Sequence, residues 1–205
     1  MPKGKAIIFN PRSANGKHRI PNSILQVGAS IHGKFDYIFI DGNRELDPWL
    51  KIEGLLKTGE IRYFCSTVMP GPQLRQAIPY TKKIKLEYPE VITIWGGYFA
   101  SNQYKTSLQS GYVDYIINGP GDVAFPSLLD AIETDDLEKL PNIKNLIYKN
   151  KEGQLIKTAT EALLDQDTLP KYPYDYLNQH YSLSQYLQKT FLGNKTWKGV
   201  FRSSR

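Results

Sequence analysis

Residues 91–98 read Val-Ile-Thr-Ile-Trp-Gly-Gly-Tyr, an apolar run that ends in a glycine turn. Similar apolar runs at residues 5–10, 61–65 and 113–117 also end in turns that contain glycine or proline. A helical pattern follows each turn, and strands that alternate with helices predict βαβ units and a parallel sheet. Ligands of such sheets bind at the carboxyl ends of the strands, so we expect these turns to meet at one binding edge.

The complete pattern predicts five strands, at residues 5–10, 35–40, 61–65, 91–95 and 113–117, with amphipathic helices between them. We therefore expect an α/β fold of the flavodoxin-like (Rossmann-like) type, a five-stranded parallel sheet with helices on both faces. Its strand order would be 2-1-3-4-5, and its ligand crevice would open between the first and third strands. Pro79 falls inside the third helical pattern and predicts a kink or a helix start at that residue.

The pattern changes after this α/β region, which we assign to residues 1–140. Residues 141–160 contain two short apolar runs around Lys151-Glu152-Gly153 and predict a β-hairpin extension. Residues 161–205 are interpreted as a linker, in which five tyrosines crowd a segment too short to form its own core: Tyr172, Tyr174, Tyr176, Tyr181 and Tyr186. This segment either wraps the domain or packs against a part that the sequence does not contain.

Composition limits the classes of function. The chain has 205 residues, a net charge of +6 and a mean hydropathy of −0.43, which predict one globular domain with an appendage. It has no apolar stretch of about 20 residues, so we expect no membrane span. The single cysteine, Cys65, is interpreted as a buried structural thiol in a cytoplasmic protein. Nucleic-acid binding is not expected, because no basic stripe with interleaved aromatic residues occurs.

Catalytic groups are sparse in the sequence. The three histidines have no metal-ligand spacing, and no phosphate-binding loop or Gly-x-Gly-x-x-Gly motif follows the first strand. Asp41 and Asp122 follow predicted strands, where catalytic groups often lie. Asp41 could equally form a turn before Gly42, and Asp122 could cap the next helix. Because candidate catalytic groups are so few, the residues alone predict a binding domain.

Several motifs carry a resemblance to a known family. Gly96-Gly97 is followed at residues 113–122 by Val-Asp-Tyr-Ile-Ile-Asn-Gly-Pro-Gly-Asp. This resembles the cobalamin-binding domains of radical S-adenosylmethionine (SAM) enzymes, in which a Gly-Gly pair precedes Val-Asp-x-x-x-x-Gly-x-Gly-Glu. Asp122 stands where the family has glutamate. Leu169-Pro170 is similar to the family's passage between domains, and residues 201–205, Phe-Arg-Ser-Ser-Arg, resemble the strand that enters the radical domain.

The resemblance implies a cobalamin-binding domain that presents its cofactor to a radical SAM domain in cis or in trans. The 4Fe-4S cluster and SAM would bind in that further domain, so the present chain is not expected to catalyse alone. Cobalamin domains that ligate cobalt through histidine carry Asp-x-His-x-x-Gly after the first strand, whereas residues 10–21 of this chain contain only His18, without this spacing. The resemblance therefore implies base-off cobalamin with no histidine ligand from this chain.

The cofactor contacts predicted on this basis lie in the turns that follow the strands. Their glycines would let the backbone approach a broad corrin ring, although tight turns alone could also require them. The predicted cofactor-binding residues are Pro11, Ser66, Thr67, Met69, Pro70, Gly71, Gly96, Gly97, Tyr98, Phe99, Gly119, Gly121 and Asp122.

Two other classes of function are compatible with the sequence. A flavin- or nucleotide-binding module would use the same crevice, with Trp95, Tyr98 and Phe99 available to stack on a ring. A non-catalytic interaction domain would instead use the tyrosine-rich segment as its docking surface.

Overall fold

The computed structural model describes residues 4–14, 19–162, 164–186, 188–189 and 196–197. It shows an α/β fold with one large sheet in the order β2-β1-β3-β4-β5-β6-β7. The strands are β1 (Lys5–Asn10), β2 (Tyr37–Asp41), β3 (Ile61–Thr67), β4 (Ile92–Gly96), β5 (Tyr115–Ile117), β6 (Leu146–Lys149) and β7 (Leu155–Lys157). The first five are parallel and follow the predicted order 2-1-3-4-5, which confirms the flavodoxin-like fold.

The sheet has seven strands, however, and the prediction of five is wrong. The hairpin β6–β7 continues the sheet, because β6 pairs antiparallel with β5 through Ile147 opposite Ile116. Leu146 and Ile147 are fully buried, so β6 contributes apolar side chains to both faces of the sheet. The alternation of polar and apolar residues over so short a strand does not distinguish a separate hairpin from one that joins the main sheet.

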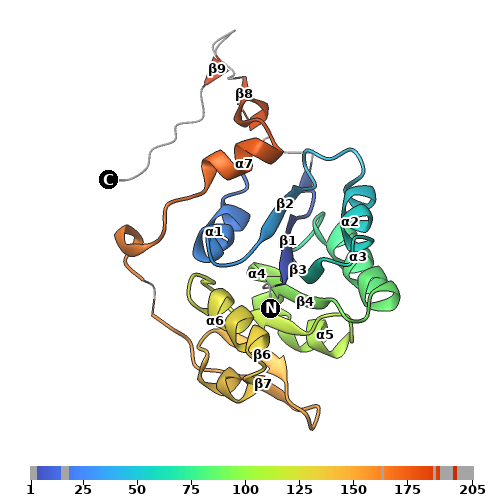
Figure 1. Cartoon of the computed structure of the whole chain (residues 1–205), viewed down its shortest axis with the longest axis vertical. Helices are drawn as coiled ribbons and strands as arrows, with labels where there is room; N and C mark the ends of the chain where they lie inside the picture. The colour runs from blue at the N-terminus through green and yellow to red at the C-terminus, as the bar shows by residue number, and fades with distance from the viewer. Residues whose placement is uncertain (1–3, 15–18, 163, 187, 190–195, 198–205) are drawn as a thin grey trace.

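Helices cover both faces of the sheet (Figure 1). On one face lie α1 (Asn22–Ile31) and α6 (Ala124–Glu133), and on the other lie α2 (Pro48–Leu56), α3 (Leu74–Glu87) and α5 (Tyr104–Gln109). The short α4 (Tyr98–Asn102) follows β4. Helix α3 begins at Leu74 and continues through Pro79, so a helix start at this proline is wrong.

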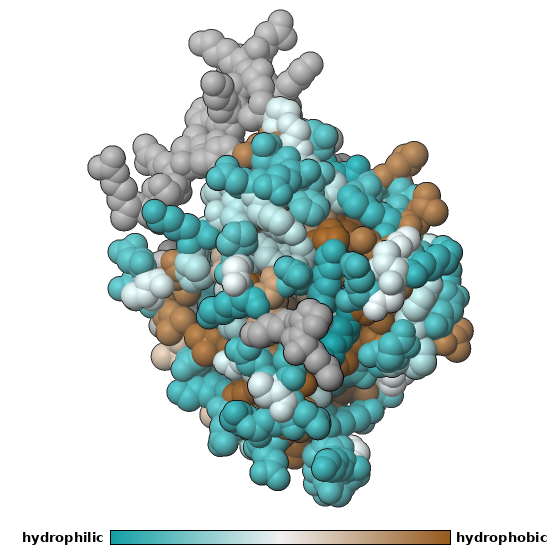
Figure 2. Space-filling model, viewed as in Figure 1, coloured by the Kyte–Doolittle hydropathy of each residue, from teal (hydrophilic) through white to brown (hydrophobic). Residues whose placement is uncertain are grey.

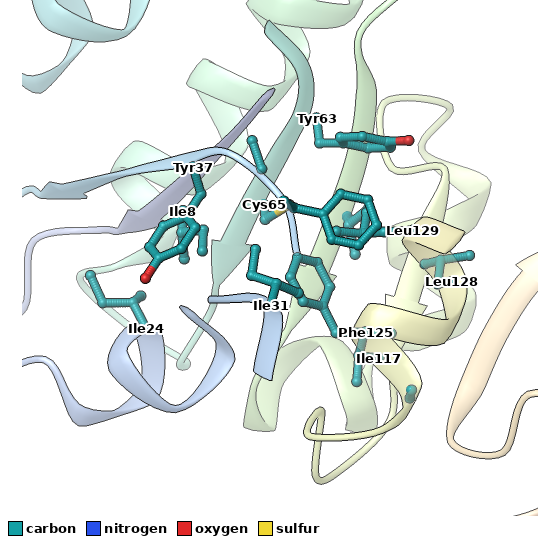
Figure 3. Packing of buried hydrophobic residues seen from close by; sticks show 14 of the residues in the cluster. Ile8, Ile24, Ile31, Tyr37, Tyr63, Cys65, Ile117, Phe125, Leu128 and Leu129 are labelled. Atoms are coloured by element: carbon teal, nitrogen blue, oxygen red, sulfur yellow. The ribbon is translucent and has the colours of Figure 1, made fainter. Parts of the chain in front are cut away.

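Neighbouring residues of β3 show how the sheet separates its two cores. Phe64 packs with α2 and α3, whereas Cys65 packs with α1 and α6. Figure 3 shows Cys65 among apolar side chains of the core on the α1–α6 side, including Ile31 and Leu129. Burial raises the pKa of the Cys65 thiol far above its ordinary value, so the thiol stays protonated and is structural, as predicted.

The tyrosine-rich segment wraps the domain. After η2 (Leu137–Asn142), the hairpin and η3 (Gln166–Thr168), the chain forms α7 (Tyr174–His180) and η4 (Leu183–Tyr186), then β8 (Gln188–Lys189) and β9 (Thr196–Trp197). Leu177, Tyr181 and Tyr186 are buried in the α1–α6 core, and α7 lies near β2 and α1 (Figure 1). Residues 201–205, which resemble a domain entry strand, lie outside the described residues. Within the described residues, no helix is long and apolar enough to span a membrane.

Candidate functional site

The carboxyl ends of the parallel strands meet at one edge of the sheet, as the sequence predicts. These strands end at Asn10, Asp41, Thr67, Gly96 and Ile117. The edge has three zones, which are a closed end over β2, a crevice between β1 and β3, and an open stretch over β3, β4 and β5. The described residues contain no cluster of three side chains able to ligate a metal ion.

The closed end is centred on Asp41, whose side chain is fully buried. One carboxylate oxygen accepts hydrogen bonds from Asn10 Nδ2 at 2.9 Å and from Asn43 N at 3.0 Å. The other accepts a hydrogen bond from Tyr186 Oη at 3.0 Å. Asp41 therefore forms the turn that the sequence allowed for, and its oxygens are occupied by structural partners rather than open to a ligand.

Tyr181 completes this closed end. Its hydroxyl accepts hydrogen bonds from Asp41 N at 3.1 Å and Lys51 Nζ at 3.2 Å and donates one to Glu45 Oε1 at 2.5 Å. Burial and the bond to Glu45 raise the pKa of Tyr181, while burial and the charge of Asp41 raise that of Tyr186. Both hydroxyls are therefore neutral at pH 7 and act as hydrogen-bond donors.

Gln73 connects the closed end to the loop after β3. Its amide nitrogen donates to Asn10 Oδ1 at 3.3 Å and to the Pro11 carbonyl at 2.9 Å, and its amide oxygen accepts from Met69 N at 2.9 Å. Gln73 is buried, as are Asn10 and Pro11. Tyr186, Asp41, Asn10, Gln73 and Met69 thus form one continuous hydrogen-bonded path across the edge.

The crevice between β1 and β3 contains a pocket of about 330 Å³. It lies between the loops that follow these two strands, where the flavodoxin-like strand order predicts a ligand crevice. Its lining residues are Arg12, Ser13, Ala14, Pro72, Arg75 and Gln76.

In the open stretch, Gly97 joins the loops after β3 and β4. Its φ of 90° is strained for other residues, and a Cβ would stand 2.9 Å from the Val68 carbonyl oxygen and 3.0 Å from Val68 N. Val68 N donates to the Gly96 carbonyl at 2.8 Å, and Phe99 N donates to the Val68 carbonyl at 3.0 Å. The fold itself therefore requires Gly97, in agreement with the tight-turn alternative.

Gly96 is different, because free space surrounds the position that its Cβ would occupy. The Ile117 Cβ, 4.0 Å away, is the one non-neighbouring atom within that distance. The Cβ of Gly121 would also approach Ile117, at 3.5 Å, and Val27 of α1, at 3.7 Å. The two glycines therefore border the same place, the seam between α1 and α6 at the carboxyl edge. Gly71 and Gly119 have positive φ, and nothing lies within 4 Å of their Cβ positions.

The other predicted contact residues vary in exposure. Tyr98 and Met69 are 64% and 47% exposed, so both can contact a ligand. Ser66 is buried, and its hydroxyl has no hydrogen-bond partner among the described residues. Phe99 packs partly into the core beside α5. Thr67 is half-buried, and Pro70 is exposed.

Asp122 does not cap α6, so that alternative is wrong. The N-cap position is Val123 and has no side-chain capping bond. The Asp122 carboxylate instead accepts a hydrogen bond from Gln26 Nε2 of α1, across the α1–α6 seam. Burial, and secondarily the charge of Asp122, raise the pKa of Tyr172, which places the wrapping segment near this seam.

The two described histidines have partners in and around α7 and β2. His32 Nδ1 is 2.8 Å from Tyr37 Oη, and His180 Nδ1 is 2.9 Å from the Tyr176 carbonyl oxygen. His18, the histidine in the loop after β1, lies outside the described residues.

Sequence reasoning missed Arg12 and Gln73, and it noticed Tyr181 and Tyr186 without placing them at this edge. Arg12 had a usable signal, since it directly follows the predicted contact Pro11. Gln73 and the two tyrosines reach the edge through hydrogen bonds to residues that lie 62 to 145 positions away in the sequence. A single sequence contains no local pattern that predicts such long-range bonds.

Comparison of the sequence with protein-family models and with curated proteins finds no match. Among solved structures, the chain is similar to the cobalamin-dependent SAM radical enzyme OxsB with aqua-cobalamin and SAM bound, with a TM-score of 0.74 and 15% identity. It is also similar to the radical SAM methyltransferase TsrM from Kitasatospora setae with cobalamin and a [4Fe-4S] cluster bound, with a TM-score of 0.65 and 14% identity.

The match to OxsB covers 89% of this chain and 25% of OxsB, and the match to TsrM covers 96% of this chain and 36% of TsrM. The chain thus spans about a quarter to a third of the length of these enzymes. It has the fold of a segment of cobalamin-dependent radical SAM enzymes, which is the fold that the sequence resemblance implied.

Proposed function

We propose that this chain binds cobalamin along the open stretch and presents it to a radical SAM domain, supplied in cis or in trans. The observation that carries the proposal is the free space at Gly96, beside the α1–α6 seam, in a fold shared with two enzymes whose structures contain cobalamin. The cofactor would be base-off, with no histidine of this chain on its cobalt.

The residues of the open stretch fit a broad, flat guest. Gly71, Gly96 and Gly119 carry no side chain above the edge, so main-chain groups could approach the amide groups at the rim of a corrin. Exposed Tyr98 and Met69 would add a hydroxyl and an apolar contact. The pocket of about 330 Å³ is too small to enclose a corrin, so the ring would lie on the edge and leave one face for another domain.

The nucleotide tail of cobalamin would enter the α1–α6 seam. Gly96 and Gly121 border this seam on the sheet side, with Val27 on α1 and Phe125 on α6. The hydrogen bond between Gln26 and Asp122 spans the two helices at this point and would have to open or shift as the tail enters. Larger side chains at either glycine would narrow the entrance.

When bound, cobalamin would supply organometallic chemistry at its cobalt atom. The chain's own residues would bind the corrin, orient it and hold the nucleotide tail away from the cobalt. Catalysis would require the radical SAM domain.

An absorbance titration with hydroxocobalamin tests this function. The wild-type chain should bind it, and Gly96→Val should bind at least about tenfold more weakly because the added methyl groups occupy the seam. Gly54→Val is the matched control, since Gly54 is exposed on α2 with nothing within 4 Å of its Cβ position. The proposal fails if the wild-type chain shows no spectral change, or if both variants bind like wild type.

A parallel titration with FMN tests the flavin alternative. Trp95 is not available for ring stacking, because it is buried and its indole nitrogen donates to Thr81 Oγ1 at 3.0 Å. Tyr98 is the exposed aromatic residue at this turn.

The interaction-domain alternative is disfavoured, since Tyr181 and Tyr186 point inward and use their hydroxyls within the chain.

A further inference from the structure

We propose that the pocket between the loops after β1 and β3 binds a phosphate group through Arg12 and Arg75. The pocket is separate from the glycine-lined stretch, and the inference does not depend on the proposed binding of cobalamin. The argument rests on how Arg12 is held, on the charges around the two arginines and on the size of the pocket.

Arg12 is held in place by main-chain carbonyl groups. Its Nε donates to the Gly42 carbonyl at 2.8 Å, and a terminal nitrogen donates to the carbonyls of Glu45 and Leu46. Its backbone N–H is fixed by Gln76 Oε1 at 2.7 Å. Neutral carbonyls orient the guanidinium without cancelling its charge.

Two acidic residues of the segment that holds Arg12, Glu45 and Asp47, use their carboxylates on other groups. Glu45, whose carbonyl binds Arg12, pairs through its carboxylate with Lys51 at 2.6 Å. Asp47 caps α2 by accepting from Trp49 N at 3.0 Å. Neither arginine forms an ion pair with a described residue, and the residues that line the pocket include no carboxylate.

Arg75 lies in the first turn of α3, which contains no acidic residue. A cation at this end of a helix is repelled by the positive end of the helix dipole, and here it also shares a pocket with a second cation. Such an arrangement costs stability in the absence of an anion. A bound anion would be attracted to both arginines and to this end of the helix dipole, which offsets the repulsion between them.

The size and the donors of the pocket favour phosphate. About 330 Å³ is at the small end of ligand pockets, which usually hold roughly 300–1,000 Å³. This volume suits a phosphate group with a small substituent. The planar fork of the Arg75 guanidinium matches two phosphate oxygens. Arg12 uses its Nε and one terminal nitrogen on main-chain carbonyls, so it would donate to the phosphate from its other terminal nitrogen.

The first experiment uses inorganic phosphate and isothermal titration calorimetry, with sodium chloride holding the ionic strength constant. The wild-type chain should bind phosphate, and Arg75→Gln should weaken binding by about tenfold or more, as expected for lost charge-assisted bonds. Arg75 is exposed and its charge is repelled at this end of α3, so Arg75→Gln should melt at the wild-type temperature or slightly above it, whereas Arg12→Gln also removes backbone contacts.

Lys82→Gln is the matched control, because it removes one positive charge from an exposed position two turns further along α3. It should bind phosphate like wild type. The proposal is overturned if wild type gives no phosphate-dependent heat, or if Lys82→Gln weakens binding as much as Arg75→Gln.

A second experiment distinguishes the two sources of the phosphate group, using cobalamin and cobinamide, which lacks the nucleotide tail and its phosphodiester. If Arg75→Gln weakens cobalamin binding but leaves cobinamide binding unchanged, the pocket holds the cofactor's own phosphodiester. If it weakens inorganic phosphate alone, the pocket serves a separate phosphorylated ligand. A chain that binds phosphate but no cobalamin would refute the proposed function and leave this site standing.

Discussion

Tyr186 donates a 3.0 Å hydrogen bond to the buried carboxylate of Asp41, which lies 145 residues earlier in the chain. This bond fastens the wrapping segment over the carboxyl end of β2. Through Asn10 and Gln73 it continues to Met69, in the loop that we expect to contact cofactor. The closed and open zones of the edge are therefore parts of one hydrogen-bonded unit.

Tyr186→Phe removes the bond at the start of this path. A buried carboxylate oxygen then loses its donor, and the free energy of unfolding should fall by about 1–3 kcal/mol. Urea denaturation measures the change. Tyr98→Phe, at a 64% exposed position, is the control and should leave stability unchanged. Equal stability of the two variants would show that the Asp41 bond does not hold the segment in place.

Gly97→Ala and Gly96→Ala separate a glycine that the fold requires from one beside open space, where we propose that the ligand binds. Alanine at residue 97 needs a positive φ and overlaps the Val68 backbone, so we expect a loss of about 2 kcal/mol or more. Alanine at residue 96 meets one atom at 4.0 Å, so stability should change by less than about 0.5 kcal/mol. Thermal melts of both variants test the contrast, which a strongly destabilised Gly96→Ala would contradict.

Stability should decrease at alkaline pH. Burial raises the folded-state pKa of Tyr181 and Tyr186 above the ordinary value of 10.0, so their contribution is complete below that pH. It is lost as the pH rises toward the folded-state pKa, because the unfolded chain releases these protons first. Each tyrosine should contribute a slope of about −1.4 kcal/mol per pH unit above about pH 10.

In Tyr186→Phe the decrease of the unfolding free energy with pH should be shallower by the contribution of one tyrosine, about 1.4 kcal/mol per pH unit. Denaturant titrations at several pH values above neutrality provide the measurement. A slope identical to that of wild type would mean that Tyr186 is accessible to solvent in the folded protein.

The absence of a histidine ligand to cobalt is tested by His18→Ala. His18 is the histidine in the loop after β1, where a cobalt-ligating histidine of the related domains would stand. We expect the bound cobalamin to keep its absorption spectrum and its affinity in this variant. A changed spectrum of the bound cofactor would identify His18 as a ligand and refute this part of the proposal.

The sequence was sufficient to predict the parallel part of the sheet, because local patterns determine it. Strand β4 and its glycine turn lie where the spacing of apolar residues predicts them. The same spacing predicts the buried apolar stripe of α6, which consists of Phe125, Leu128, Leu129 and Ile132. Pro79 was misleading, since tertiary packing of Ala77 and Ile84 holds α3 together around it.

The long-range polar contacts could not be predicted in this way. Tyr181 and Tyr186 were noticed as an unusual cluster, but nothing local indicates that their partners are Glu45 and Asp41. Gln73 has no distinctive sequence context, although it links two loops of the edge. At the candidate site, the sequence shows where the glycines lie along the chain, but only the structure shows that steric contact constrains Gly97 and that open space lies beside Gly96.

The antiparallel direction of β6 places the hairpin turn at Lys151-Glu152-Gly153 on the opposite side of the molecule from the carboxyl edge (Figure 1). This turn is exposed, and the visible face around it is mostly hydrophilic (Figure 2). A fluorophore or a surface tether attached at Glu152 would therefore leave the glycine-lined stretch and the arginine pocket free. Immobilisation through this turn would leave the carboxyl edge accessible for measuring the two proposed ligands.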